Sequence, residues 1–471
     1  MKKTKIVATI GPKTENQESL EKLLKAGMNV MRLNFSHGDF AEHQKRINNL
    51  KKAVKSTGIN CAVLQDLGGP KIRLGEFNTE QVELVAGEKI TITTESMIGD
   101  SKKVSINYKR FPKEVKVGDR IMVDDGKKKF EVVSIKGEEV ICKIIVGGMT
   151  KGKRGVNLPD SDVTISSLTA KDKADLEFGI KNKVDFMALS FVRTAKDIVE
   201  LRTILDGRKS KTIGIIAKIE TPQAVQNIDE ILAVTDGVMI ARGDLAIEVP
   251  FEKVPTIQKS IIEKCNNLGK PVITATQMLE SMIKSPVATR AEVSDIANAI
   301  FDGTDAVMLS EETTLGLYSS EAVEVMTKVA REVEKNYVER DTVHGDRSGQ
   351  REVTDSVTSS VVKTAHDVGA KMIIALTDSG FTARMISRHK PHTHILALSP
   401  NKTTVNKLCL SFGCKPVEVK KYNTITEVFQ IVRKICLDNK YASKGDKVVI
   451  VGGVPFNTKG LSTNMLVVEE I

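Results

Sequence analysis

The stretch Ile215-Ile216-Ala217-Lys218-Ile219-Glu220 is an apolar run that ends in a lysine and a glutamate. The pattern recurs further along the chain in Gly237-Val238-Met239-Ile240-Ala241-Arg242-Gly243-Asp244. A buried parallel strand is continuously apolar, and charge appears only where the strand reaches the edge of its sheet. Both stretches therefore predict buried strands whose carboxylates and cations meet at one edge. Two hard oxygen ligands beside a lysine and an arginine suit Mg²⁺-assisted phosphate chemistry.

Apolar runs of this kind occur eight times along the chain, and most of them end in residues able to do chemistry. The segments between them show helical spacing of apolar residues, for example Leu20, Leu23 and Leu24. Eight strand–helix units are typical of an α/β fold, the (β/α)8 TIM barrel, whose active site lies at the carboxyl ends of the strands. The predicted strands cover residues 5–10, 29–35, 61–67, 185–191, 212–220, 237–243, 271–277 and 306–311.

The third of these units is interrupted after Gly68-Gly69-Pro70, where short alternating segments replace the long apolar runs. Segments 82–84, 89–94, 120–123 and 130–135 are separated by turns such as Asp125-Gly126. This pattern predicts an antiparallel insert, a small β-barrel domain over residues 70–165. Because it follows a strand end, the insert would stand above the active face as a lid. The barrel itself would then comprise residues 1–69 and 166–340.

A polar stretch at residues 340–354 is predicted to be a linker. Beyond it, helical segments alternate with apolar strands at 372–377, 395–399, 416–419, 448–452 and 465–468. This alternation predicts a separate α/β domain over residues 341–471. Its remoteness in sequence from the charged strand ends favours a regulatory role.

Composition excludes several classes of protein. The chain has 471 residues, a net charge of +10 and no tryptophan, so platforms for stacking nucleic-acid bases are not expected. No apolar stretch approaches the ~20 residues that a membrane helix needs, and the basic start is followed too soon by Gly11-Pro12 for a signal peptide. The six scattered cysteines show no metal-binding spacing, so we expect reduced thiols and a cytoplasmic location.

The second and third strands end in a further polar set. Alternation places Arg32, Asn34 and Ser36 on one face of the second strand, where the arginine would clamp phosphate and the oxygens could hold a cation. The alternative is an ordinary helix start, with Ser36 or Asp39 as N-cap, but an idle arginine inside a barrel strand would be costly. Asp66 ends the third strand as a cation ligand or an orienting carboxylate, and Arg73 follows the glycine hinge within reach of phosphate.

Lys218, Glu220 and Asp244 form the centre of the predicted site. Mg²⁺ usually takes one or two protein carboxylates together with substrate oxygens, which fits Glu220 and Asp244. Lys218 can neutralise charge on a transferred phosphoryl group. A structural ion-pair network is the alternative. Gly243 would let backbone amides approach a substrate carboxylate at a helix start.

Three more segments carry polar residues that could bind ligands. Thr276 and Ser310, at the ends of the last two strands, can hydrogen-bond substrate or water. In the last domain Thr377-Asp378-Ser379-Gly380-Phe381-Thr382 follows a strand and opens a helix, which predicts a phosphate cradle. A plain helix cap would explain part of this pattern. We expect the cradle residues Thr377, Ser379, Gly380 and Thr382 to form a regulatory site.

Taken in order, these segments resemble the pyruvate kinase family along the whole chain. The most specific matches are Ile216-Ala217-Lys218-Ile219-Glu220 and Ala275-Thr276-Gln277-Met278-Leu279-Glu280-Ser281-Met282. Further matching stretches cover residues 9–12, 31–38, 240–245 and 289–295.

The resemblance implies transfer of a phosphoryl group from phosphoenolpyruvate to ADP, giving pyruvate and ATP. By matching position, Glu220 and Asp244 would bind Mg²⁺ or Mn²⁺, and Lys218 and Arg32 would contact the phosphoryl group. Gly243, Asp244 and Thr276 would bind the substrate, and Thr276 and Ser310 would belong to the network that protonates the enolate. The nucleotide side would comprise Pro12, Asn34, His37, Arg73 and Arg154. The resemblance also implies a homotetramer.

The hinge departs from the family's commonest form, Asp-Thr-Lys-Gly-Pro-Glu-Ile-Arg. Here it reads Asp66-Leu67-Gly68-Gly69-Pro70-Lys71-Ile72-Arg73. The K⁺ site of the family maps to Asn34, Ser36, Asp66 and Leu67, and its threonine side chain is missing. Lysine in place of the acidic residue goes with K⁺ independence in the family. The Lys71 ammonium can supply the charge that K⁺ would bring, and two cations there would repel. We therefore expect K⁺ not to be required.

A second departure concerns regulation. The family's pocket for fructose 1,6-bisphosphate usually uses a tryptophan and a C-terminal arginine, whereas this chain has no tryptophan and its late loop, residues 452–460, contains no arginine. The monophosphate cradle is intact, which favours AMP or a sugar monophosphate as activator.

Two other readings stay open: a Mg²⁺-dependent barrel lyase acting on pyruvate-like acids, which would not need the lid, Arg73 or Lys218, and a non-catalytic scaffold.

Overall fold

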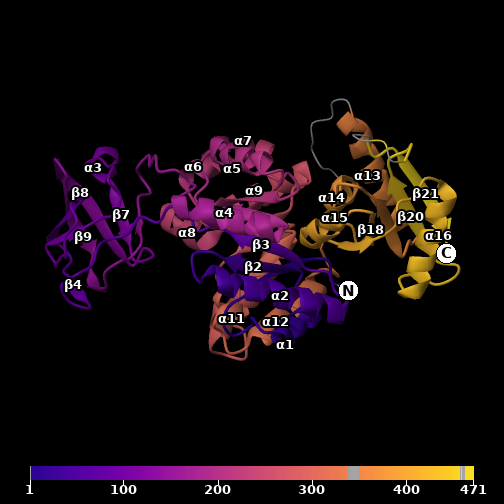
Figure 1. The fold of residues 1–471 in the computed structure, drawn as a ribbon, viewed down its shortest axis with the longest axis horizontal. Coiled ribbons are helices and arrows are strands. Elements are labelled where there is room, and N and C mark those ends of the chain that lie inside the picture. The colour runs from indigo at the N-terminus through magenta and orange to yellow at the C-terminus, as the bar shows by residue number, and fades with distance from the viewer. Residues whose placement is uncertain (1, 338, 340–349, 457, 459–461) are drawn as a thin grey trace.

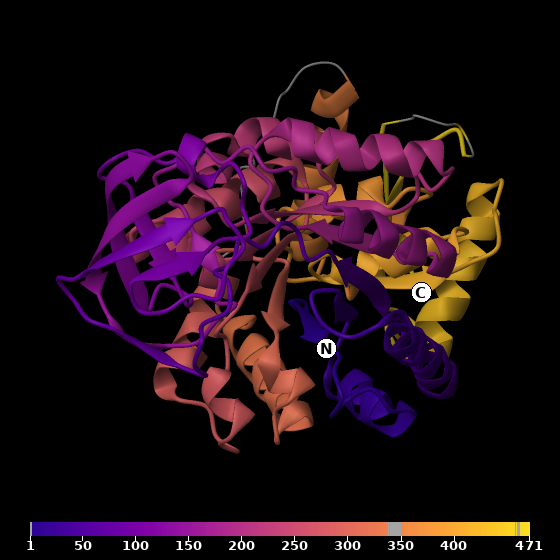
Figure 2. The same ribbon diagram turned by 60° about the vertical axis from the view of Figure 1, so that its left-hand side comes forward.

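A computed structural model describes the whole chain except residues 1, 338, 340–349, 457 and 459–461. Figure 1 shows three parts along the long axis: the lid at one end, the barrel in the middle and the C-terminal domain at the other end. In Figure 2 the lid comes forward and its two connections to the barrel can be followed. No helix of the described part of the chain is long and apolar enough to cross a membrane.

The central part is a closed parallel barrel, as predicted. Its strands follow one another around the ring in the order β1-β2-β3-β12-β13-β14-β15-β16, and β16 pairs with β1 to close it. Parallel pairing brings every carboxyl end to the same rim. The strands are β1 (Lys5–Thr9), β2 (Val30–Asn34), β3 (Ala62–Asp66), β12 (Phe186–Leu189), β13 (Gly214–Ile219), β14 (Gly237–Ala241), β15 (Val272–Ala275) and β16 (Ala306–Leu309).

Helices cover the outside of the barrel with their apolar faces inward. In α1, Leu20, Leu23 and Leu24 are buried, as their spacing predicts. The N-cap of α2 is Asp39, not Ser36, and Asp39 forms a capping box with Glu42. The helices are α1 (Gln17–Ala26), α2 (Phe40–Thr57), α4 (Ala170–Asn182), α5 (Ala195–Gly207), α6 (Pro222–Gln226), α7 (Ile228–Val234), α8 (Arg242–Glu248), η1 (Phe251–Lys253), α9 (Val254–Leu268), η2 (Glu280–Ile283), α10 (Arg290–Phe301), α11 (Glu311–Thr314) and α12 (Ser319–Val333).

The insert after β3 has its own apolar core and two sheets. A six-stranded sheet has the order β11-β7-β8-β9-β5-β6, and a second sheet pairs β10 with β4. Its pairs are antiparallel except that of β5 with β6. Single bridges from Arg73 to Gly155 and from Leu74 to Ile106 join the two edges of the larger sheet into a small barrel. The elements are β4 (Val82–Leu84), β5 (Lys89–Thr93), β6 (Lys103–Ser105), α3 (Phe111–Glu114), β7 (Arg120–Val123), β8 (Lys128–Lys136), β9 (Glu139–Val146), β10 (Gly148–Thr150) and β11 (Val156–Asn157).

The C-terminal part is an α/β domain with a five-stranded sheet in the order β19-β18-β17-β20-β21, in which only β21 is antiparallel to its neighbour. The prediction of a linker is wrong for residues 350–354. Helix α13 begins at Gln350, and Thr354 within it is buried. The rest of the predicted linker, 340–349, lies outside the described residues. The elements are α13 (Gln350–Asp367), β17 (Met372–Leu376), α14 (Phe381–Ser387), β18 (His394–Ser399), α15 (Lys402–Lys407), η3 (Leu408–Leu410), β19 (Cys414–Glu418), α16 (Ile425–Asp438), β20 (Lys447–Gly452) and β21 (Met465–Glu470).

A buried ion pair joins this domain to the amino-terminal end of the barrel. Lys390 Nζ lies 3.0 Å from Asp305 Oδ1, which also accepts a hydrogen bond from the backbone of Phe412. The other oxygen of Asp305 accepts from the backbone of Val272, at the start of β15. One carboxylate therefore fixes the C-terminal domain to a barrel strand, at the opposite end from the charged rim.

Candidate active site

The carboxyl rim of the barrel gathers the charged strand ends that the sequence singles out. At its centre is Lys218, near the end of β13, with its ammonium almost fully buried. Its Nζ lies 2.8 Å from Glu220 Oε1 and 3.4 Å from Asp66 Oδ1, and it donates to Ser190 Oγ at 2.7 Å. Residues at the ends of three strands, β3, β12 and β13, thus contact one cation.

Arg32, on β2, occupies the other side of Asp66. Its Nε donates to Asp66 Oδ2 at 2.7 Å, and its Nη1 donates to Thr9 Oγ1 at 2.8 Å. Asp66 therefore balances two cations with one carboxylate. Burial raises the pKa of Asp66, but the charges of Lys218 and Arg32 outweigh it and hold the pKa below its ordinary value. The buried arginine is thus a cation anchored at the rim by Asp66 and Thr9, and its contact with phosphate stays a prediction.

Glu220 is fully buried, and its two carboxylate oxygens have different partners. Its Oε2 accepts a hydrogen bond from the backbone of Phe191 at 2.8 Å, while Oε1 is paired with the Lys218 ammonium but accepts no hydrogen bond from the described residues. Burial raises the pKa of Glu220, and the nearby carboxylate of Asp244 adds to the rise. For Lys218, burial lowers the pKa, but Asp66, Glu220 and Asp244 together raise it above its ordinary value.

A divalent ion fits this arrangement. No group of three or more His, Cys, Asp or Glu side chains in the described part of the chain could hold a metal alone. Glu220 and Asp244 would supply two carboxylates, which is the number that Mg²⁺ takes when substrate oxygens and water complete its coordination. The oxygen of Glu220 without a hydrogen bond offers a ready ligand, and a positive ion beside it would offset the burial that disfavours its charge.

Gly243 and Thr276 meet at the next two strand ends. The Gly243 amide donates to Thr276 Oγ1 at 2.8 Å, and Thr276 has φ of +71°, a strained conformation for a β-branched residue. Arg242 holds this turn in place, because its guanidinium donates to the carbonyl oxygens of Ala275 and Thr276. The strain and its support point to a site at this turn.

Arg242, the arginine that the sequence places beside these carboxylates, has structural partners in the described part of the chain. Its guanidinium forms a two-pronged pair with Asp295 of α10, with both N–O distances 2.7 Å. Together with the two carbonyl contacts, this pair occupies the guanidinium with structural partners. Arg242 thus supports the shape of the rim, while Lys218 and Arg32 are the buried cations at its centre.

A cleft of about 550 Å³ separates the lid from the rim. Five residues of the predicted site line this cleft: His37, Lys71, Arg73, Arg154 and Asp244. Lys153 and Glu248, which were not predicted, line it as well. Arg154 lies 3.3 Å from Asp124, within the lid. Burial, followed by the charges of Lys71 and Arg73, lowers the pKa of His37, and burial, Arg73 and Lys218 lower that of Lys71. Cations and carboxylates both line this cleft: Lys71, Arg73, Lys153, Arg154 and Arg193 lie there together with Asp124, Asp125, Asp244, Glu248 and Glu311.

Asn34, Asp66 and Leu67 of the predicted K⁺ site already have polar partners. Asn34 Oδ1 accepts from the backbone of Ser36, and the Leu67 carbonyl accepts from Ser190 Oγ at 2.8 Å. Asp66 is paired with two cations. Ser36 lies beside the hinge, since a Cβ added to Gly68 would come within 3.2 Å of its Oγ.

Two predicted residues lie at the edges of the arrangement. Pro12 is exposed, in a turn after β1, and does not line the cleft. Ser310 is at the N-terminus of α11, where its backbone amide donates to Glu312, and among the described residues no contact of its hydroxyl marks it as part of the centre.

The loop 377–380 of the C-terminal domain is an ordered turn before α14. Thr377 Oγ1 accepts from the Gly380 amide at 2.9 Å, and Gly380 has φ of +83°. Thr382 pairs with Thr463 at 2.9 Å, and Ser379 is exposed. A helix cap thus accounts for Thr377, and the phosphate site stays a prediction. Within the late loop 452–460, residues 457, 459 and 460 lie outside the described residues.

Sequence analysis missed Ser190 and Phe191, which hold Lys218 and Glu220, and Glu248 at the lid. Ser190 and Phe191 end the fourth apolar run, so the rule that strand ends carry the site could have found them. Glu248 is buried on α8 and accepts from Asn157 of β11 at 2.7 Å. No signal in the sequence marks a glutamate on this helix as a contact with the lid.

Comparison with known proteins places these features in one family. Residues 1–323 match the family model described as "Pyruvate kinase, barrel domain", and residues 355–469 match "Pyruvate kinase, alpha/beta domain". The chain is 43% identical to a pyruvate kinase of Clostridium acetobutylicum, with both chains covered completely. It is 44% identical to that of Geobacillus stearothermophilus, covering 100% of this chain and 80% of the relative.

A solved structure agrees with these matches. The crystal structure of a pyruvate kinase from Cryptosporidium parvum is similar to this fold, with a TM-score of 0.92 and 35% sequence identity. The similarity covers 100% of this chain and 96% of that chain. The likeness therefore extends over barrel, lid and C-terminal domain together.

The buried Glu248 predicts a pH-dependent stability. Burial, with smaller contributions from Asp244 and Glu220, raises the pKa of Glu248 from 4.5 to about 7. The folded state therefore binds this proton more tightly than the unfolded state, and the stabilisation present below pH 4.5 is lost as pH rises through 7. We expect Glu248→Gln, which stays neutral, to stabilise the protein by roughly 1–3 kcal/mol at pH 8 and by much less at pH 5.

Thermal unfolding with EDTA at the two pH values measures this difference. Glu263→Gln, an exposed site on α9, is the matched control and should show no such dependence. An equal shift in Tm at both pH values for Glu248→Gln would contradict the assignment.

Proposed function

The chain belongs to the pyruvate kinase family of phosphotransferases, and we propose that its rim cluster transfers a phosphoryl group from phosphoenolpyruvate to ADP. The observation that carries the proposal is the buried Lys218 ammonium, held at the rim between Glu220, Asp66 and Ser190. A lyase would not need this lysine, the lid or Arg73, and a scaffold would not keep them together.

In this reaction the bond between phosphorus and the enol oxygen breaks, and a bond to an oxygen of the ADP β-phosphate forms. Such transfers depend mainly on positioning and on stabilising negative charge. Lys218 and Arg32 would face the phosphoryl oxygens, because both are anchored through Asp66. Gly243 and Thr276 would receive the carboxylate of phosphoenolpyruvate, and their supported turn fixes the direction from which it enters.

The metal and the proton complete the proposal. Glu220 and Asp244 would hold Mg²⁺ or Mn²⁺, which when bound draws charge from the phosphoryl oxygens. After transfer the enolate takes a proton at its methylene carbon and becomes pyruvate. Thr276 and Ser310 would contribute to the hydroxyl and water network that delivers this proton.

The nucleotide would occupy the cleft between lid and rim. Asn34, His37, Arg73 and Arg154 would contact it, with Pro12 at the outer edge, as the family resemblance implies. Arg73 and Arg154 lie on the two chain segments that meet at the hinge side of the lid, since Arg73 bridges to Gly155. A movement of the lid would therefore carry both arginines together.

The remaining assignments concern organisation. We place the boundaries at 1–69 and 166–340 for the barrel, 70–165 for the lid and 341–471 for the regulatory domain. We also propose a homotetramer, as the family resemblance implies. The six cysteines are free and buried, which supports a cytoplasmic location.

The reaction itself is tested by following pyruvate formation from phosphoenolpyruvate and ADP with Mg²⁺, coupled to NADH oxidation by lactate dehydrogenase. We expect turnover by the natural chain and a loss of about 10²–10³ in kcat for Lys218→Ala, the range for removing one group that stabilises transition-state charge. The control is Lys434→Ala, an exposed lysine paired with Asp438 in the C-terminal domain. Absence of turnover from folded protein would reject the function.

Lys71 makes a second prediction, about K⁺. The charges of Asp244 and Asp66 act on Lys71, less strongly than those of Arg73 and Lys218, and three of the predicted K⁺ ligands, Asn34, Asp66 and Leu67, have partners. Activity in Tris buffer should be the same with and without K⁺, whereas Lys71→Glu should be active only with K⁺, because the carboxylate brings back a negative charge to be balanced. Lys102→Glu, on the exposed surface of the lid, is the control. Strong activation of the natural chain by K⁺ would contradict this.

The effector cradle makes a third prediction. AMP or a sugar monophosphate should raise activity at low phosphoenolpyruvate. Ser379→Asp should abolish the response, because it places a carboxylate where the phosphate would bind. Activity is measured while each effector is titrated, and the natural chain without effector is the reference. A response to fructose 1,6-bisphosphate alone would show that the cradle is not the effector site.

A further inference from the structure

The loop between β12 and α5, residues 190–193, touches both connections between lid and barrel. On the first connection, Ser190 Oγ donates to the carbonyl of Leu67 at 2.8 Å. The hinge packs directly against this loop, since a Cβ added to Gly69 would lie 2.9 Å from Ser190 Cβ and 3.0 Å from the Phe191 ring. Gly69 also has φ of +65°, so a larger residue here would be strained as well as crowded.

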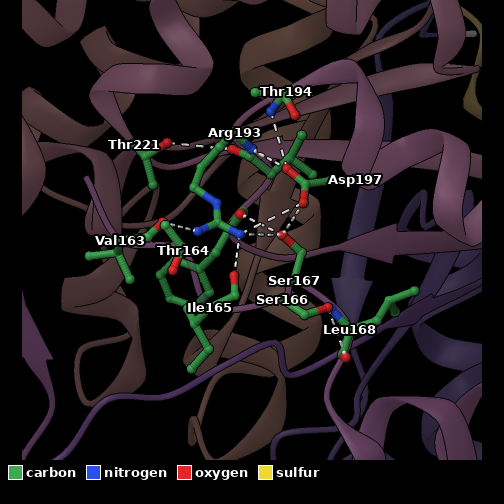
Figure 3. A network of polar contacts seen from close by, with 12 residues as sticks. Val163, Thr164, Ile165, Ser166, Ser167, Leu168, Arg193, Thr194, Asp197 and Thr221 are labelled. Carbon is green, nitrogen blue, oxygen red and sulfur yellow. Dashed lines mark hydrogen bonds and ion pairs between the residues drawn. The ribbon is translucent and has the colours of Figure 1, made fainter. Parts of the chain in front are cut away.

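The second connection, residues 158–168, is held by the other end of the same loop, as Figure 3 shows. The guanidinium of Arg193 donates to the carbonyls of Val163 and Ile165. Ser167 Oγ donates to the carbonyl of Phe191 at 3.0 Å and contacts Asp197 at 2.9 Å. Asp197 in turn accepts from the Arg193 amide at 2.9 Å, which closes the network around the loop.

The inner side of the loop faces the two central residues of the rim. Ser190 Oγ accepts from Lys218 Nζ at 2.7 Å, and the Phe191 amide donates to Glu220 Oε2 at 2.8 Å. Phe191 has φ of +54°, a backbone conformation that turns this amide toward the carboxylate. Thr221 Oγ1 contacts the carbonyl of Val192, so the end of β13 and the loop are joined a third time.

We propose that this loop keeps the catalytic pair in register with the lid, and that Ser190 is the positioning residue for the Lys218 ammonium. A lysine ammonium on its flexible stem can rotate its three donors freely. Here the ammonium forms ion pairs with the carboxylates of Glu220 and Asp66 and donates a hydrogen bond to Ser190, whose hydroxyl in turn donates a hydrogen bond to the hinge carbonyl of Leu67. The hydroxyl therefore connects the hinge to the cation that would meet the phosphoryl group.

The inference rests on the proposed function, because it concerns the step in which Lys218 acts. A hydrogen bond that directs a reacting charge matters most in the transition state, so its loss lowers kcat more than it changes KM. A purely structural serine would instead lower stability and leave kcat unchanged in the protein that remains folded. The two roles are thus separable by kinetics.

The test compares Ser190→Ala and Ser190→Thr with Ser387→Ala. Ser387 is a matched control: it is buried, and its hydroxyl donates to the carbonyl of Phe412 at 2.7 Å, far from the rim. We expect Ser190→Ala to lower kcat about tenfold or more, the loss of a hydrogen bond to a charged group, with KM values for phosphoenolpyruvate and ADP changed less than about threefold. Ser190→Thr, which keeps the hydroxyl, should recover most of the turnover.

Each outcome decides the matter. Turnover of Ser190→Ala within about twofold of the natural chain overturns the proposal, as does a fall in kcat that the threonine does not reverse. A similar fall in Ser387→Ala shows a general effect of losing a buried serine and also overturns it. If neither the natural chain nor Ser387→Ala produces pyruvate, the proposed function has failed, which is a different result from any of these.

Discussion

The structure depends on a compensated set of buried charges at one end of the barrel. Arg32 and Lys218 share the carboxylate of Asp66, and Lys218 also faces Glu220. Removing any one member would leave an uncompensated charge in an apolar surrounding, which is far more costly than the pair is stabilising. The set therefore has to form together, and it forms only if β2, β3 and β13 end at the same level. Parallel pairing in a closed barrel meets this requirement.

The same constraint shapes the surroundings of the set. The guanidinium of Arg242 binds Asp295 and two backbone carbonyls, and these contacts hold Thr276 in a backbone conformation that it would not adopt alone. The lid is attached at the level where the charges lie, and its two connections meet on one loop, residues 190–193. The C-terminal domain is attached at the opposite end through Asp305 and Lys390, so it leaves the rim open to ligands.

Much of this was predictable from sequence for a clear physical reason. A buried strand has to be apolar until it reaches the rim, so the charged ends of β13 and β14 predict both the parallel barrel and the position of its site. The direction of a side chain carries no such signal: Arg242 follows an apolar run as Lys218 does, yet points to structural partners. The start of α13 was hidden because its first turns are polar in sequence. The single bridges of Arg73 and Leu74 that close the lid were equally hidden, because one paired residue leaves no periodic pattern.

The charges at the rim also explain why a metal and an anionic substrate would be bound together. Arg32 and Lys218 are matched by Asp66 and Glu220, and Asp244 adds one further negative charge. Burial, and after it the charge of Asp244, raises the pKa of Glu220, and the excess of negative charge disfavours a second anion. A divalent cation between Glu220 and Asp244 would reverse the sign of the cluster. The cleft above adds the cations of Lys71, Arg73 and Arg154, beside carboxylates such as Asp124 and Glu248. A divalent cation held by Glu220 and Asp244 would thus make the centre more receptive to a phosphorylated acid.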